Sequence, residues 1–166
     1  MELGDFPESA DPNATGIRST TIYDVPIFEY QPLDETKQQI RLLRLLKTST
    51  SEKLRCDIVI HDLDTLPKYR ALSYVWGCPQ PTYPLLIQGK CLHIRQNLHR
   101  FLHEYTGANR SAVNRYRPPS YGNHDESGEL LWVDQICIDQ SNVRERNHQV
   151  NLMSRIYKQC KSVITW

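Results

Sequence analysis

Two apolar segments of this sequence each lead into side chains that could contact a ligand. Trp76 and Gly77 end "ALSYVWG", and Asp134 follows "ELLWV". If both segments are parallel strands, their carboxyl ends meet at the sheet edge where α/β proteins bind ligands. A small pocket is then expected, in which Gly77 permits close backbone approach, Trp76 stacks and Asp134 accepts hydrogen bonds. The alternative is that Trp76 and Tyr74 fill the core while Gly77 supplies a turn. Asp134 is the stronger candidate, although it could simply cap the next turn.

Glu145 and Ser73 are further residues whose types could do chemistry. Glu145 could act as a general acid or base, but it has no visible partner carboxylate. Asn142 lies three residues before it, which is the spacing of a helix capping box. Ser73 lies within a predicted strand and lacks the sharp strand-to-helix turn of a nucleophile elbow. The sequence therefore assigns no catalytic residue.

Histidines and cysteines are the residue types that could bind a transition metal. His99 and His103 have the i, i+4 spacing of two ligands on one helix face, but "HRFLH" lacks the glutamate of H-E-x-x-H and a third ligand. We therefore expect a solvated histidine face and no metal. The odd cysteine count and the absence of a C-x-x-C pair favour reduced core cysteines over disulfides or zinc. The five are Cys56, Cys78, Cys91, Cys137 and Cys160.

Length, composition and charge describe one globular domain. The 166 residues are 39% hydrophobic and 23% charged, with a formal net charge of +1. Neither nucleic acid nor an anionic membrane is therefore an expected partner. No segment approaches the roughly 18 consecutive apolar residues of a membrane helix. The acidic first twenty residues are unlike a signal peptide, which predicts a cytoplasmic protein.

The first half of the chain predicts an arm and a series of strands. Residues 1–25 are polar and acidic and predict a flexible arm, followed by a domain over 26–166. "QQIRLLRLLK" fits a helix or a strand, whereas "LRCDIVIHD" alternates as a half-buried strand. The turn-like "TSTSEK" between them favours a hairpin that begins with Ile40–Leu46. "ALSYVWG" predicts a central strand covered on both faces, and "LLIQGKCLHI" a hairpin that turns at Gly89 and Lys90.

Two amphipathic helices and two further strands complete the pattern. The first helix has Asn97 as its expected N-cap and Gly107 as its stop, and residues 108–128 predict a long surface loop. Its apolar stripe consists of Leu98, Phe101, Leu102 and Tyr105. "ELLWVDQICI" and "KSVITW" predict strands on either side of the second helix. That helix carries a stripe formed by Val143, Val150, Met153, Ile156, Tyr157 and Cys160. The alternation predicts an α/β fold with a flavodoxin-like, mainly parallel sheet flanked by helices and extended by N-terminal antiparallel hairpins.

Three ordered motifs resemble the fungal heterokaryon-incompatibility (HET) domain. "YRALSYVWG", "LLWVDQICIDQ" and "ERNHQVNLMSRIY" are similar to the family patterns Y-x-A-L-S-Y-x-W-G, L-W-I-D-x-I-C-I-N-Q and E-R-x-x-Q-V-x-x-M-x-x-I-Y. The motifs contain all the candidate pocket residues, namely Ser73, Tyr74, Trp76, Gly77, Trp132, Asp134 and Glu145. The resemblance covers roughly residues 30–166 and supports a strand at Ile40–Leu46. Asp139 departs from the family's usual asparagine. The family usually continues beyond Trp166, so we expect an incomplete domain with an uncovered edge strand.

The resemblance implies a role in fungal non-self recognition, where HET proteins trigger programmed cell death when incompatible hyphae fuse. Protein partners or self-association are the contacts it implies. The family also resembles TIR domains, some of which cleave NAD with a glutamate on a helix after the third core strand. Here that helix would lie beyond Trp166. NAD is then expected only as a ligand of a longer domain, this fragment is expected to be inactive, and the enzyme question stays open.

Overall fold

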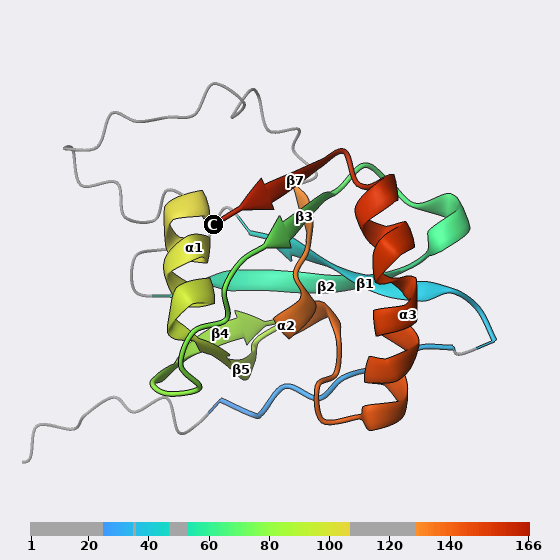
Figure 1. Cartoon of the computed structure of the whole chain (residues 1–166). Helices are drawn as coiled ribbons and strands as arrows, with labels where there is room; N and C mark the ends of the chain where they lie inside the picture. The colour runs from blue at the N-terminus through green and yellow to red at the C-terminus, as the bar shows by residue number, and fades with distance from the viewer. Residues whose placement is uncertain (1–24, 35, 47–52, 107–128) are drawn as a thin grey trace, which may run out of the picture.

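The computed structural model describes residues 25–34, 36–46, 53–106 and 129–166, which form a seven-stranded sheet flanked by helices (Figure 1). The strands are β1 (Gln39–Leu45), β2 (Arg55–Asp62), β3 (Arg70–Ser73), β4 (Thr82–Ile87), β5 (Lys90–Arg95), β6 (Leu130–Trp132) and β7 (Ser162–Thr165). The helices are α1 (Gln96–Thr106), α2 (Asp134–Cys137) and α3 (Val143–Gln159), with a 3-10 turn, η2, at Leu63–Thr65. The predicted surface loop, and all of the predicted arm except Val25, lie outside the described residues.

The sheet has the strand order β5-β4-β2-β1-β6-β3-β7 and is mixed. β3 pairs in parallel with β6 and with β7, as expected for three neighbouring strands connected by helices. β2 also pairs in parallel with β4, but β1 pairs antiparallel with both β2 and β6, and β4 pairs antiparallel with β5. The predicted α/β class is confirmed, whereas the prediction of a mainly parallel sheet is wrong.

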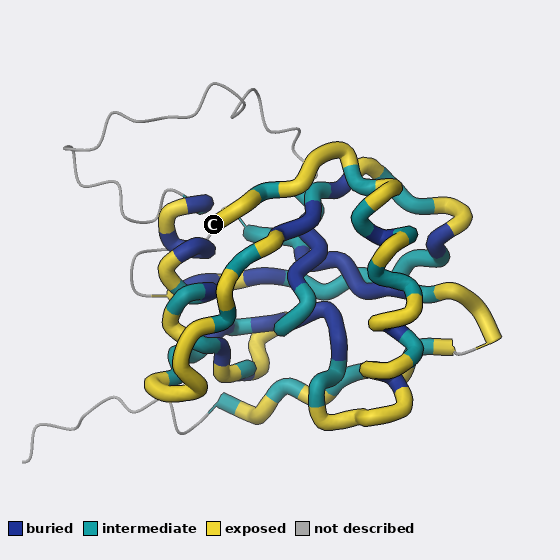
Figure 2. The backbone as a smooth tube through the Cα atoms, in the orientation of Figure 1, coloured by how far each residue is buried: buried dark blue, intermediate teal, exposed yellow. Residues whose placement is uncertain are grey.

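β1 and β2 lie at the centre of this sheet and are not an addition beside it. Ile40, Arg41, Leu42 and Leu43 are all buried, so β1 is covered on both faces (Figure 2). A strand covered on both faces has a nearly continuous apolar sequence. The same property left "QQIRLLRLLK" ambiguous between helix and strand.

The β4–β5 hairpin turns at Gln88 and Gly89, which have φ values of 50° and 78°. Two consecutive positive φ values are typical of the tight turns that match the twist of a hairpin. A Cβ on Gly89 would meet no atom within 4 Å, so the backbone conformation alone favours glycine there. The predicted hairpin is confirmed, with its turn one residue earlier than expected.

Two predicted strands are shorter than their apolar runs. In β3, Ala71 and Leu72 are buried on opposite faces, as expected, but the strand ends at Ser73 and Val75 is 73% exposed, so the expected coverage on both faces is wrong from Ser73 onward. β6 ends at Trp132, and the next residues form the short helix α2 because the backbone N–H groups of Ile136 and Cys137 both donate to the Val133 carbonyl. Hydrophobic periodicity could not show that each of the two apolar runs contains only a short strand, followed by a different conformation.

The two longer helices follow the predicted positions but differ in detail. All four residues of the predicted α1 stripe are buried. Asn97 is not an N-cap, because it lies inside α1 and its side chain donates to the Val75 carbonyl; Gly107 lies outside the described residues. In α3, Val143 and Val150 are 57% and 52% exposed, so the predicted apolar stripe is wrong at these positions. The face turned toward the core instead contains Glu145 and Gln149 as well as Ile156.

Candidate functional site

The structure brings Trp76 and Asp134 together, as predicted from the ends of their two segments. The Trp76 indole Nε1 donates to Asp134 Oδ2 at 2.8 Å. The guanidinium of Arg95, at the end of β5, lies over the Trp76 ring at 4.9 Å from its centroid, a cation–π arrangement. Trp76 is therefore held on its edge by a carboxylate and on its face by a cation.

A hollow of about 580 Å³ opens beside Trp76. Its wall includes aromatic and charged side chains of several chain segments, among them Phe28, Tyr30, Trp76, Glu29, Arg95 and Asp139. The hollow lies beyond the carboxyl ends of β3 and β6, the part of a parallel sheet where ligands generally bind. The wall carries both signs of charge, so its electrostatics do not select one class of small ligand.

Gly77 has a packing role in this arrangement. Its φ is +72°, and a Cβ there would lie only 2.8 Å from Nδ2 of Asn97. The same Asn97 nitrogen donates to the Val75 carbonyl, and Arg95 Nη1 donates to the Gly77 carbonyl at 2.9 Å. Glycine is therefore required by a left-handed turn packed against α1, which agrees with the turn alternative.

Asp134 bonds to Trp76 but is not the expected cap, because it is the first residue of α2 and the N-cap position is Val133. Asp134 Oδ1 accepts a hydrogen bond from the Gln135 backbone N–H. The backbone carbonyl of Asp134 accepts one from Gln140 Nε2. Burial raises the pKa of Asp134 above its ordinary value, and the bonds from Trp76 and from the Gln135 backbone oppose that rise. The carboxylate thus binds Trp76 with one oxygen and the adjacent backbone N–H with the other, so both oxygens already have partners.

Replacing Asp134 with asparagine should make stability less dependent on pH. Because the folded-state pKa lies above the ordinary 3.8, ionisation costs more in the folded chain than in the unfolded chain. The free energy of unfolding should therefore fall as pH rises from 3.8 through the raised pKa, and D134N should lack this fall. Urea unfolding from acidic to neutral pH measures it. Trp76→Phe, which removes the opposing bond, should enlarge the fall, and identical pH profiles in all three proteins would contradict the expectation.

Of the seven predicted pocket residues, only Trp76 lines the hollow. Tyr74 Oη donates to Gln135 Oε1 at 3.0 Å, and burial raises the pKa of its phenol. Ser73 is exposed, and its carbonyl accepts from the Trp166 backbone N–H. Trp132 is fully buried and packs edge-on against Tyr157 at 5.5 Å between ring centroids. Trp132 is therefore a core residue.

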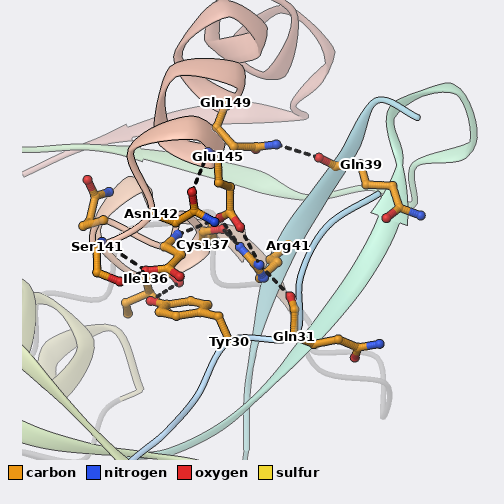
Figure 3. Close-up of polar contacts among 12 residues, drawn as sticks. Tyr30, Gln31, Gln39, Arg41, Ile136, Cys137, Ser141, Asn142, Glu145 and Gln149 are labelled. Atoms are coloured by element: carbon orange, nitrogen blue, oxygen red, sulfur yellow. Dashed lines mark hydrogen bonds and ion pairs between the residues drawn. The ribbon is translucent and has the colours of Figure 1, made fainter. Parts of the chain in front are cut away.

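Glu145 forms a buried ion pair with Arg41 that the sequence analysis missed (Figure 3). Arg41 Nη1 lies 2.5 Å from Glu145 Oε1, and Arg41 Nη2 lies 3.0 Å from Oε2. The two side chains are 1% and 7% exposed. The predicted cap is correct in one half, because Asn142 Oδ1 accepts from the Glu145 backbone N–H. In a capping box, the Glu145 side chain would accept from the Asn142 backbone N–H. Here its Oε1 accepts from the Asp139 backbone N–H instead.

Backbone carbonyls and one aromatic ring complete the surroundings of Arg41. Its Nη1 donates to the Cys137 carbonyl at 3.1 Å, and its Nη2 donates to the Gln31 carbonyl at 2.7 Å. The Tyr30 ring lies 4.8 Å from the guanidinium carbon, and the Tyr30 hydroxyl donates to the Ile136 carbonyl. The guanidinium is thus surrounded by acceptors from three parts of the chain (Figure 3). The sequence signal for this site was weak, because Arg41 and Arg44 both lie in the leucine-rich run of β1.

The histidines and cysteines differ in part from their predicted settings. His103 is only 6% exposed and contacts His99, so the expected solvated histidine face is wrong. The cysteines are free, as predicted; Cys56, Cys91 and Cys137 are buried, but Cys78 is exposed. In the described part of the chain, no three or more histidine, cysteine, aspartate or glutamate residues gather as a metal site.

Comparison with known proteins identifies the family. The model of the family described as heterokaryon incompatibility protein (HET) matches residues 69–166, which include β3, β6, α3 and β7 together with the Trp76–Asp134 contact. The chain therefore belongs to the HET family. It is 30% identical over 156 residues to heterokaryon incompatibility protein 6, OR allele, of Neurospora crassa, a match that covers 92% of this chain.

The match covers 22% of the Neurospora protein, so this chain spans about a fifth of that relative's length. No solved structure matches the chain, and the flavodoxin-like or TIR-like assignment stays a prediction. Among the described residues, none of the helices has the length and apolar character that crossing a membrane requires. The cytoplasmic location also stays a prediction.

Proposed function

We propose that this chain acts in heterokaryon incompatibility as an interaction module that passes a cell-death signal through protein contacts, including self-association. Family membership and the Neurospora relative, whose name states this role, support the incompatibility part. The contact part rests on the exposed edge strand β7. The NAD-cleaving alternative stays a prediction, and release of nicotinamide from NAD by the chain itself would favour it.

β7 is the last strand of the sheet and pairs only with β3 in the described part of the chain. It has no charged residue, and Val163 is 45% exposed. Figure 2 shows exposed backbone in the stretch next to the C-terminus. Trp166 beside it is 47% exposed. An edge strand without charges offers unpaired backbone groups to a strand of another chain. This edge is therefore the contact surface that we assign to self-association.

Replacing Val163 with lysine should weaken self-association at least tenfold, which corresponds to about 1.4 kcal/mol. A lysine on an edge strand opposes pairing with a second edge because its charge would have to be desolvated. Light scattering on the purified chain over a range of concentrations measures the dissociation constant. Val143→Lys is the matched control, because Val143 is also exposed but lies on α3.

Expression of the same variants in a fungal strain connects this contact to function. We expect the unchanged chain and V143K to arrest growth and V163K to lose that effect. A chain that stays monomeric at every concentration, or V143K and V163K proteins that behave alike, would contradict the proposed contact. If V163K still arrested growth, the incompatibility role would not depend on self-association.

A further inference from the structure

His99 and His103 lie one turn apart on α1, and their imidazoles meet. The two Nε2 atoms are 2.9 Å apart. The His99 ring stacks on Tyr83 of β4, with 4.5 Å between centroids and 20° between planes, which fixes the orientation of the ring. His103 is buried, whereas His99 is only partly covered. This histidine pair belongs to neither the hollow beside Trp76 nor the ion pair of Glu145.

Two converging imidazole nitrogens match the first half of a transition-metal coordination sphere. Zinc–nitrogen bonds are about 2.0–2.1 Å long, so two such bonds at a tetrahedral angle hold their nitrogens roughly 3.4 Å apart. The observed separation of 2.9 Å is about half an ångström shorter. A small rotation of the His103 side chain would open it without a change in the helix backbone, while the His99 ring stays stacked on Tyr83.

Metal binding requires a change of tautomer in one ring of the pair, with the proton exchanged through water. In the present contact one Nε2 donates its proton to the other. A metal ion would take the lone pairs of both Nε2 atoms, so the ring that carries the bridging proton would release it to water and take up a proton from water at its own Nδ1. Nδ1 of His103 is buried without a hydrogen-bond partner among the described residues, so no bond fixes that tautomer.

We propose that His99 and His103 form a two-imidazole binding site for a divalent transition-metal ion. No third histidine, cysteine or carboxylate joins them in the ranges that the structure describes, so water would complete the coordination. Imidazole ligands favour Cu²⁺ over Ni²⁺ and Zn²⁺ and have little affinity for Mg²⁺. The bound ion would connect two successive turns of α1 and stabilise the folded chain by mass action.

Thermal unfolding with each metal ion alone tests this site. Cu²⁺, Ni²⁺ and Zn²⁺ should raise Tm, by about 3–6 °C at ten times the dissociation constant, and Mg²⁺ should not. His99→Gln should abolish the rise. His93→Gln is the matched control, because His93 is an exposed histidine on β5, and it should keep the full rise. An equal rise in H99Q, or no rise in the unchanged protein, would overturn the proposal.

NMR of the histidine imidazoles tests the site in the unchanged protein and therefore does not require a folded variant. Titration with Zn²⁺ should shift the Nε2 resonances of His99 and His103 together, with a single saturation curve, while His93 stays in place. Resonances of the two rings that move independently, or not at all, would contradict a shared ion.

Discussion

Replacing Glu145 with glutamine is expected to lower the free energy of unfolding by about 3–5 kcal/mol. The substitution preserves the shape of the side chain and one acceptor oxygen, but it leaves the guanidinium of Arg41 buried at 1% exposure without a counter-charge. Removing one member of a buried pair costs more than the pair itself contributes, because the other charge stays desolvated. Urea unfolding followed by circular dichroism measures the loss.

The chain contains a natural control for this substitution. Arg155 and Asp64 form an ion pair whose side chains are 37% and 78% exposed. Asp64→Asn removes the same charge at the surface and should cost no more than about 1 kcal/mol. If E145Q and D64N had similar unfolding free energies, burial would not give the Arg41 pair the importance that we assign to it.

Replacing Trp132 with alanine is expected to cost about 3–5 kcal/mol as well. The residue is completely buried at the end of β6, and its ring packs against Tyr157 of α3, so alanine would leave a cavity between sheet and helix. Its indole Nε1 is buried without a hydrogen-bond partner among the described residues. The contribution of Trp132 is therefore one of packing.

Trp132→Phe distinguishes packing from a specific role of the indole. Phenylalanine keeps most of the volume and removes only an N–H without a described partner, so its cost should be about 1–2 kcal/mol. Unfolding curves of both variants should keep the slope of the unchanged protein, which shows that the unfolded surface is the same. A phenylalanine variant as unstable as the alanine variant would indicate a bond to the indole nitrogen.

The parallel direction of β3, β6 and β7 could be predicted because each strand is a short apolar run and the connections between them contain helices. The mixed character of the sheet could not be predicted. Strand order depends on which strand edges pair, whereas a sequence pattern shows only which faces of a strand are apolar. The buried residues of β1 illustrate this, because a run that is apolar apart from Arg41 suits a central strand of either direction.

The sequence could predict a contact in the candidate site where the two residues directly follow neighbouring parallel strands. The contact of Trp76 with Asp134 follows from that rule. The Arg41–Glu145 pair was not predictable in this way, because its two members are 104 residues apart and a capping box already accounted for Glu145. His99 and His103 had the right spacing, but sequence alone could not reveal that Tyr83 and the sheet cover them.

The position of Arg41 bears on where an independently folding fragment can be cut. The family match begins at residue 69, after β1, β2 and Arg41. A protein excised at that boundary would lack the two middle strands and would retain Glu145 as an uncompensated acid in its interior. Because Arg41 also binds the carbonyl of Gln31, the minimal autonomous unit has to start ahead of that residue. The limits of the family match and the physical limits of the domain therefore do not coincide in this chain.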